Sequence, residues 1–247
     1  MNTPVVDSRS HPKQMKTIHL FPLLILLLSL PGCADDDDTA TPRATTFDYA
    51  FGSDAEGWMG DFADYPEGEE DFYELTFDYA TLPTPLDTQE GALRQSGNNH
   101  SDDLFMYAYR PIEGLEPGAT YEATFELRIA TDVPSGSFGV GGSPGESVYV
   151  KAGLLSEAPV RTLNQLNEYR VNFDKGNQSA GGPDMIVLGN FANGTDQSEY
   201  TLKTLRNTEP FLATADADGK LWFVVGTDSG YESTTTIYYD AISVSLR

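Results

Sequence analysis

A strict alternation of apolar and polar residues over Thr120–Ala130 is the feature that most constrains what this chain can fold into. The apolar positions are Tyr121, Ala123, Phe125, Leu127 and Ile129, and the positions between them are Glu122, Thr124, Glu126 and Arg128. Successive side chains of a β-strand point to opposite faces of a sheet, so this pattern buries one face and leaves the other in solvent. The preceding stretch, Gly114–Gly118, has Pro and Gly where a tight turn needs them. The segment therefore predicts a half-buried strand that is entered through a turn.

Period-two segments separated by turn residues recur along the chain. Phe72–Tyr79 alternates in the same way, and its apolar side is made of Tyr73, Leu75, Phe77 and Tyr79. Similar patterns predict strands near 46–51, 91–96, 103–110, 147–154, 168–174, 184–190, 199–204, 220–226 and 235–246. No stretch has a sustained helical period, although 162–168 would fit one helical turn. About ten strands at this spacing predict an all-β fold, a β-sandwich or jelly roll, in one domain over 47–247.

The last of these strands contains a shift in its apolar pattern. Ile237 and Tyr239 occupy one phase of the alternation, whereas Ile242 and Val244 occupy the other. A shift of one residue in a period-two pattern predicts a β-bulge, here beside Asp240.

The first 32 residues have the order of a secretory signal. An apolar run over 20–30 follows Lys13 and Lys16, and it is shorter than the about 20 residues needed to span a bilayer. Met15 is an alternative start that would make the leader more compact. We therefore expect residues 1–32 to be removed on export.

The leader ends in Leu30-Pro31-Gly32-Cys33, which resembles the lipobox of bacterial lipoproteins. The resemblance implies that Cys33, the single cysteine of the chain, is lipidated (palmitate among its acyl chains) and becomes the N-terminus. Such acyl chains anchor a protein to the membrane at about 0.8 kcal/mol per buried methylene. Ala34 after the cysteine resembles the pattern that leads to outer-membrane sorting in two-membrane bacteria. The alternative is an ordinary signal peptide with a cysteine there by chance.

The residues after Cys33 predict a tether over 33–46. Four consecutive aspartates, Asp35–Asp38, are followed by small polar residues as far as Thr46. A run of like charges with small polar residues cannot bury a core and stays extended. The alternative for the four aspartates is chelation of calcium.

The charge of the chain excludes several classes of partner and site. It has 15 Lys and Arg against 38 Asp and Glu, a formal net charge of −23, and loss of the leader's three Lys and Arg and one Asp takes this to −25. So acidic a chain repels the phosphates of nucleic acid and of anionic lipid. His100 is the sole histidine after the leader, and with one cysteine this excludes a Cys/His zinc cluster. The acidity fits an exposed soluble face, a salt-rich habitat or binding of divalent cations.

Two stretches, Gly114–Arg128 and Thr236–Leu246, resemble carbohydrate-binding modules of the galactose-binding-like jelly-roll type. In those modules the second stretch is the terminal strand, whose aspartate often helps bind a structural calcium near the N-terminal strand. The resemblance thus implies Asp240, with Asp48 of the first strand, as calcium ligands. The alternative is that both are solvent-facing strand residues. The middle of the chain resembles an uncharacterised group of bacterial lipoproteins.

An aromatic-rich stretch broken by glycines, Glu56–Tyr65, is the candidate glycan site. Aromatic rings stack on the C–H faces of sugars, and carboxylates accept hydrogen bonds from sugar hydroxyls. The candidate ligand-binding residues are Trp58, Asp61, Asp64 and Tyr65. The alternative for Trp58 is that it fills the core of the sandwich. Trp222, in a stretch that is apolar on both faces, is expected in the core.

Other motifs give weaker signals. The glycine loop Gly139–Gly145 lacks the Lys-Ser/Thr of a phosphate-binding loop, and a tight connection is expected there. Gly226–Gly230 does not fit the G-x-S-x-G nucleophile motif. His100 is expected to be a polar loop residue, and Lys151 to pair with an acid. Glycoside hydrolysis needs two acids roughly 5–10 Å apart, and the sequence does not indicate which.

The leading hypothesis is a lipid-anchored, non-catalytic jelly-roll domain of the cell envelope that binds glycan or another extracellular ligand, with structural calcium as a further expectation. Two alternatives belong to other classes. One is a surface enzyme that acts on polysaccharide through paired carboxylates, and the other is a structural or adhesive envelope protein with a protein partner. An aromatic platform beside acids favours the first, two converging carboxylates in a cleft the second, and a large flat apolar patch the third.

Overall fold

A computed structural model describes residues 44–247, and these residues form fourteen strands and no helix. The leader, Cys33 and all of the tether before residue 44 lie outside the described residues. The strands are β1 (Thr45–Tyr49), β2 (Met59–Ala63), β3 (Thr76–Thr81), β4 (Gly91–Asn98), β5 (Leu104–Ile112), β6 (Thr120–Thr131), β7 (Val148–Leu155), β8 (Arg161–Leu163), β9 (Tyr169–Val171), β10 (Met185–Asn190), β11 (Thr201–Arg206), β12 (Phe211–Thr214), β13 (Leu221–Ser229) and β14 (Thr234–Leu246). Within this range no helix is available that could cross a membrane. The predicted all-β fold is confirmed.

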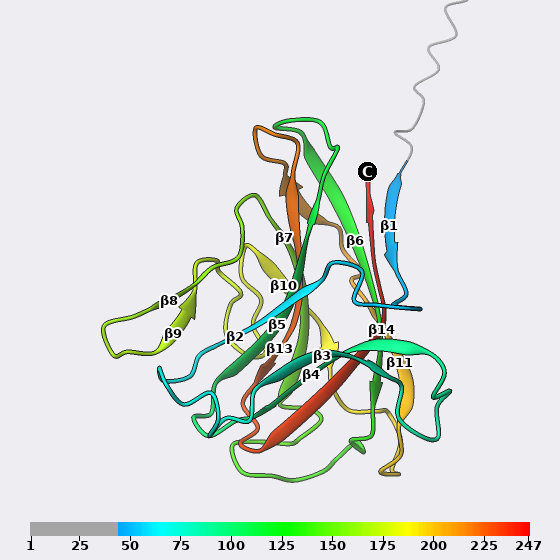
Figure 1. Ribbon diagram of the computed structural model, residues 1–247, viewed down its shortest axis with the longest axis vertical. Coiled ribbons are helices and arrows are strands. Elements are labelled where there is room, and N and C mark those ends of the chain that lie inside the picture. The colour runs from blue at the N-terminus through cyan, green and yellow to red at the C-terminus, as the bar shows by residue number, and fades with distance from the viewer. Residues whose placement is uncertain (1–43) are drawn as a thin grey trace, which may run out of the picture. The chain divides into compact units, whose positions relative to one another are not determined.

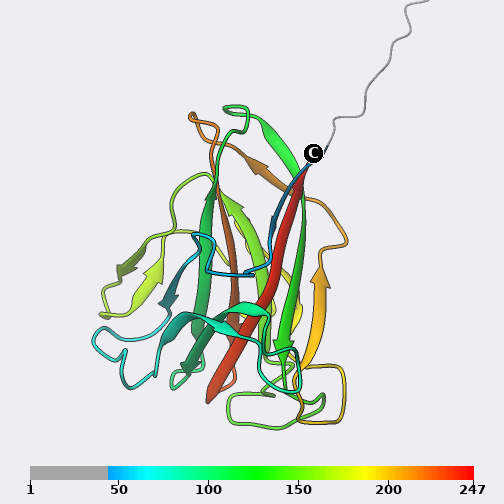
Figure 2. The same ribbon diagram turned by 45° about the vertical axis from the view of Figure 1, so that its right-hand side comes forward.

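Two antiparallel sheets pack face to face as a sandwich (Figures 1 and 2). One has seven strands, in the order β11-β6-β14-β4-β3, with β12 also paired to β6 and β1 also paired to β14. The other has five strands in the order β10-β7-β13-β5-β2. A separate hairpin of β8 and β9 projects beside the five-stranded sheet (Figure 1).

The long strands β6 and β14 form the centre of the seven-stranded sheet. The apolar side of β6 is buried as predicted, with Phe125, Leu127 and Ile129 fully inside. The predicted bulge in β14 is confirmed, because its register on β6 shifts between Tyr239 and Ala241. At this bulge β14 changes its partner on the other side, from β4 to β1.

The core lies between the two sheets. Val225 and Phe223 of β13 and Met106 of β5 face Phe125 and Ile242 of the other sheet, and all five side chains are at most 1% exposed. Burial of such side chains stabilises the fold by about 1.5–3 kcal/mol each. The opposite face of the five-stranded sheet, which we call the outer face, is not covered by the other sheet.

Three strands were not predicted from the sequence because they are short or, in β2, contain a glycine. These are β2, β8 and β12. In β2, Gly60 lies so close to the other sheet that a Cβ there would be 2.1 Å from Cγ of Phe77. The glycine thus marks close packing of two sheets and not a break in the chain. The helical turn thought compatible with 162–168 is instead the β8–β9 hairpin.

The segment predicted as a strand over 72–79 is a strand only from Thr76 onward. Tyr73 is buried as the alternation requires, but it lies in a turn. Glu74 has a positive φ of 52°, a left-handed conformation that ends any extended run. The period-two pattern therefore placed the side chains correctly and the strand start a few residues early.

Candidate functional site

The outer face of the five-stranded sheet carries buried charged side chains, whereas the middle of the inner face is apolar. On β13 the inward side chains are apolar in the middle of the strand, whereas the outward ones include Trp222 and Asp228. On β7 the outward position next to Gly226 is Lys151. Both Lys151 and Asp228 are fully buried, although they lie outside the apolar core.

Lys151 and Asp228 form a buried ion pair across neighbouring strands. The Nζ of Lys151 lies 2.7 Å from Oδ2 of Asp228, which confirms that Lys151 pairs with an acid. The same ammonium donates hydrogen bonds to the carbonyl oxygens of Lys175 (2.8 Å) and Ala180 (3.0 Å). Burial lowers the pKa of Lys151, and the charge of Asp228 opposes that shift. All donors of this buried ammonium therefore have acceptors, as a charge in this position requires.

Three carboxylates meet at this end of the outer face, and we call them the acidic trio: Asp64, Asp103 and Asp228. One oxygen from each lies within 4.8 Å of the others, which is close enough to hold a metal ion. Asp64 follows β2 with a left-handed φ of 66°, a conformation that Asp tolerates better than most residues. Asp103 immediately precedes β5. The trio thus collects carboxylates from the ends of three strands.

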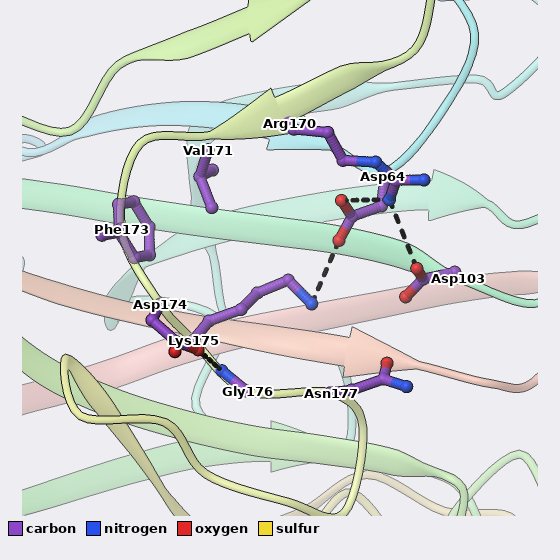
Figure 3. Close-up of a pocket in the computed structure, with 9 residues that line it drawn as sticks. All are labelled: Asp64, Asp103, Arg170, Val171, Phe173, Asp174, Lys175, Gly176 and Asn177. Carbon is purple, nitrogen blue, oxygen red and sulfur yellow. Dashed lines mark hydrogen bonds and ion pairs between the residues drawn. The ribbon is translucent and has the colours of Figure 1, made fainter. Parts of the chain in front are cut away.

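The side chain of Lys175 reaches into the acidic trio. Its Nζ lies 2.9 Å from Oδ2 of Asp228 and 3.1 Å from Oδ2 of Asp64. Burial acts to lower the pKa of Lys175, but the charges of Asp228 and Asp64 outweigh it and raise the pKa. Arg170 approaches from the other side, 2.6 Å from Asp64 and 3.4 Å from Asp103 (Figure 3). The protein itself therefore supplies cations to these acids.

A cavity of about 350 Å³ opens beside this cluster. Its lining combines two members of the trio with the residues that follow β9: Asp64, Asp103, Arg170, Val171, Phe173, Asp174, Lys175, Gly176 and Asn177 (Figure 3). Burial, and then the negative charge of Asp64, raise the pKa of Asp103 to about 6. Asp103 is one-third exposed, and its Oδ1 is buried without a hydrogen-bond partner.

One oxygen of Asp64 lies within 4.8 Å of one oxygen of Asp103, and the paired carboxyl groups of retaining glycosidases are about 5–5.5 Å apart. Asp64 is, however, only 4% exposed, and its two oxygens are engaged by Arg170 and Lys175. A carboxylate held in this way has no free oxygen to direct at a substrate. The arrangement is that of a charge-balanced structural cluster.

The expected calcium ligands Asp48 and Asp240 lie elsewhere, on the seven-stranded sheet. Asp240 is buried at the bulge, and its carboxylate is paired with Arg128. Asp48 is an exposed residue of β1, opposite Ser243 of β14. Within residues 44–247, the group of three acids that meets the distance requirement for a metal is the acidic trio, which contains neither of them.

The open part of the outer face carries an aromatic row along β5. The rings of Phe105, Tyr107 and Tyr109 follow one another with centroids 5.1 and 5.8 Å apart, and Tyr109 lies 6.1 Å from Trp222 of β13. Phe105 and Tyr107 are completely buried, whereas Tyr109 and Trp222 are partly exposed. Met59, opposite Tyr109 on β2, is 41% exposed.

An ion pair stands beside these rings. Asp61 of β2 accepts a hydrogen bond from the hydroxyl of Tyr107 (3.3 Å) and lies 3.3 Å from Nε of Arg161. Arg161 also donates to the hydroxyl of Tyr65 and lies over the ring of Tyr169, 4.1 Å from its centroid. About a quarter to a third of the Asp61 and Arg161 side chains is exposed. We call Met59, Asp61, Tyr109, Arg161 and Trp222 the open patch.

The structure places the four residues expected to bind glycan in three different locations. Trp58 is 4% exposed and packs against Tyr49 and Phe223, with ring centroids 5.4 Å away in both cases, so it belongs to the core and offers no face to a ligand. Asp61 and Tyr65 come together at Arg161. Asp64 joins the buried ionic cluster. Trp222, which is expected in the core, is partly buried and packs against the buried cluster of the outer face.

Sequence reasoning missed several residues that matter here, among them Tyr109, Arg161, Arg170 and Lys175. Arg161 lies on β8, which no periodic pattern predicted, and Arg170 lies on β9, within the strand expected near 168–174. Their charge was nevertheless a signal, because cationic residues are scarce in this chain and these lie in one short stretch. Tyr109 lies in a predicted strand, but which face of that strand is open depends on the packing of the sheets.

No protein-family model and no curated protein matches this chain. Solved structures similar to it include carbohydrate-binding modules of the β-sandwich type. One, described for the promiscuous specificity of such modules, is 15% identical with a TM-score of 0.40; the match covers 77% of this chain and 57% of that one. A module described for mannan recognition is 12% identical with a TM-score of 0.38, covering 83% and 99%.

The K1 cleaved adhesin domain of Lys-gingipain from Porphyromonas gingivalis W83 is also similar. It is 12% identical with a TM-score of 0.36, and the match covers 82% of this chain and 98% of that one. At such TM-scores the ligand of this chain has to be argued from its own residues.

Proposed function

We propose that this chain is a non-catalytic glycan-binding domain, and that the open patch is its binding surface. The observation that carries the proposal is the pair of partly exposed rings, Tyr109 and Trp222, on the outer face beside the partly exposed ion pair of Asp61 and Arg161. Such rings offer flat apolar surface to the C–H face of a sugar. The carboxylate accepts hydrogen bonds from sugar hydroxyls, and the guanidinium donates them.

The charge of the chain narrows the class of glycan. With a formal net charge of −23, the protein repels polyanionic chains such as those rich in uronic acid or sulfate. The cations beside the rings are already paired with acids: Arg161 with Asp61, and Lys220, whose Nζ lies 5.9 Å from the ring centroid of Trp222, with Glu113. The ligand class that the patch favours is therefore a neutral glycan.

We further propose that Lys175 takes the place that calcium would have in the acidic trio. A divalent cation and the ammonium of Lys175 would compete for Asp64 and Asp228, which Lys175 contacts at 3.1 and 2.9 Å. Lys151 and Arg170 add two more positive charges at contact distance from the trio. These positive charges would repel an added divalent ion. We therefore expect the domain to keep its fold without calcium.

The proposed location is the outer membrane, with the domain anchored through lipid on Cys33. The support for this is the sequence Leu30-Pro31-Gly32-Cys33 and the Ala34 that follows. The test is labelling of expressing cells with a palmitate analogue. We expect the label on the wild-type chain and its loss, with release of the chain from the membrane fraction, in Cys33→Ser.

The glycan proposal is tested by titration calorimetry with a panel of neutral trisaccharides: β-1,4-linked gluco-, xylo-, manno- and galacto-oligosaccharides. We expect heat of binding with at least one member, and at least about tenfold weaker binding in Trp222→Ala, since a stacked aromatic anchor is worth about 1.4 kcal/mol or more. Asp61→Asn should weaken binding less. No binding by any member, or equal binding in Trp222→Ala, would contradict the proposal.

The matched control is Leu212→Ala. Leu212 is 64% exposed and lies on β12 of the other sheet, so the variant removes an exposed apolar side chain away from the open patch. Its affinity should equal that of the wild type. Thermal unfolding of each variant separates loss of binding from loss of fold.

A further inference from the structure

One end of the outer face is covered by the chain itself, by residues 171–184, which we call the covering segment. Phe173 lies edge-on to Phe105 and Tyr107, with ring centroids 6.2 and 5.9 Å away. These two rings have no exposed surface, whereas Tyr109, the next ring of the row, is partly exposed. The aromatic row is therefore covered at one end and open from Tyr109 onward.

Polar contacts hold the covering segment directly on the sheet. The Nζ of Lys151 donates to the carbonyl oxygens of Lys175 and Ala180, and the backbone N of Gln178 donates to Asp228 (2.9 Å). At the far end of the segment, a Cβ added to Gly153 of β7 would lie 1.9 Å from the carbonyl oxygen of Asp184. At these contacts the segment rests directly on β7 and β13, and the cavity of about 350 Å³ lies beside them, at Asp64 and Asp103.

The β8–β9 hairpin borders a second side, next to the end of β2. Beyond β2 the chain pairs with β9, because the backbone N of Asp64 donates to the carbonyl of Tyr169 (2.7 Å) and that of Tyr169 donates to Tyr65 (2.9 Å). From this hairpin Arg161 reaches Asp61 at the border of the open patch. A glycan on Tyr109 thus meets Arg161 on one side and the covering segment at one end.

We propose that the open patch recognises the end of a neutral glycan chain and not its interior. This inference rests on the proposed function. The terminal sugar stacks on Tyr109 and Trp222, its hydroxyls bond to Asp61 and Arg161, and the remaining sugars leave past Trp222, away from both obstacles. A polymer lying along β5 would run into the covering segment where Phe173 packs on Tyr107 and Phe105.

The test is calorimetry with the panel series that binds, using its trisaccharide, its hexasaccharide and its polymers of two defined lengths. We expect one protein bound per chain for all four, with a similar affinity per chain. A number of proteins per chain that rises with polymer length would overturn the inference and leave the proposed function intact. Absence of binding by every series would contradict the proposed function itself.

End-modified trisaccharides sharpen the test. One carries a reduced reducing end (the alditol), and the other carries a methyl ether on the non-reducing terminal hydroxyl at C4. We expect one of the two to bind at least about tenfold more weakly, because a hydrogen-bonded hydroxyl is lost or crowded there. Equal binding of both modified forms and the parent sugar would overturn the inference.

Discussion

The two faces of the five-stranded sheet are formed by the same strands but carry different kinds of side chain. On β13, Phe223 and Val225 face inward and are fully buried among apolar neighbours of the other sheet. On the outward side of the same strand, Asp228 is buried among charges, and Trp222 is partly exposed beside Tyr109. The inner face therefore supplies stability through apolar burial, and the outer face holds charges and rings that no other sheet covers.

The two tryptophans give the largest expected contrast between the faces. Trp58→Ala should lower the free energy of unfolding by about 3–5 kcal/mol, because it leaves a large cavity in the core. Trp222→Ala should lower it by about 1 kcal/mol, since its ring is partly in solvent. Urea unfolding followed by circular dichroism measures both. Equal destabilisation by the two variants would contradict the distinction between a structural inner face and a binding outer face.

The buried ion pair on the outer face should matter almost as much as the core. Asp228→Ala leaves the ammonium groups of Lys151 and Lys175 without their shared carboxylate. Removal of one partner of a buried pair costs about 3–5 kcal/mol, and urea unfolding measures it. Asp78→Ala is the control, because Asp78 and its partner Arg94 are both more than one-third exposed. This control should lose about 1 kcal/mol or less, and an equally small loss in Asp228→Ala would show that the cluster does not hold the covering segment.

The effect of calcium on the unfolding temperature tests whether Lys175 takes the place of a metal ion in the acidic trio. We expect the wild-type domain over 40–247 to unfold at the same temperature in millimolar calcium and in EDTA. Lys175→Met should unfold at a lower temperature in EDTA and regain several degrees with calcium, because the acidic trio then lacks its internal cation. A calcium response of the wild type that Asp240→Asn removes would instead support the site expected at Asp48 and Asp240.

The smallest expected effect concerns the pH dependence of stability. The pKa of Asp103 is raised by burial from 3.8 to about 6, so its protonated form is favoured in the folded state. Its contribution is complete below the unfolded pKa of 3.8 and is lost as the pH rises through about 6. Asp103→Asn, which mimics the protonated form, should therefore gain about 1 kcal/mol over the wild type at pH 7.5, after allowance for solvent screening, and little at pH 4. Urea unfolding at the two pH values checks this, and a gain that is larger at pH 4 would contradict the shift.

The parts of the fold that the sequence predicts are those that depend on a strand's own residues. Alternation placed β6 and the bulge at Asp240 correctly, because the side-chain period of a strand, and a shift in that period, can be read from the strand's own residues. It could not distinguish Trp58 from Trp222, since the exposure of a ring depends on which sheet face another layer covers. The sequence shows Gly60 only as part of a glycine-broken stretch, whereas the structure shows that this glycine allows the two sheets to approach closely.

The candidate site was predictable only in part for the same reason. Asp61 and Tyr65 were expected to act together, and they meet at Arg161. Arg161 comes from a hairpin about a hundred residues further along the chain, and its approach depends on backbone pairing of β9 with the residues after β2. Long-range pairing of this kind leaves no periodic trace in the sequence.

The fluorescence of a single tryptophan tests the central claim most directly. The chain has two tryptophans, so Trp58→Phe leaves Trp222 as the sole reporter, and Trp222→Phe leaves Trp58. On addition of the neutral trisaccharides of the panel, we predict that at least one shifts the emission of Trp222 and protects it from acrylamide quenching. The same sugar should leave the emission of Trp58 unchanged. Unchanged emission and quenching of Trp222 with every sugar would contradict glycan binding at the open patch.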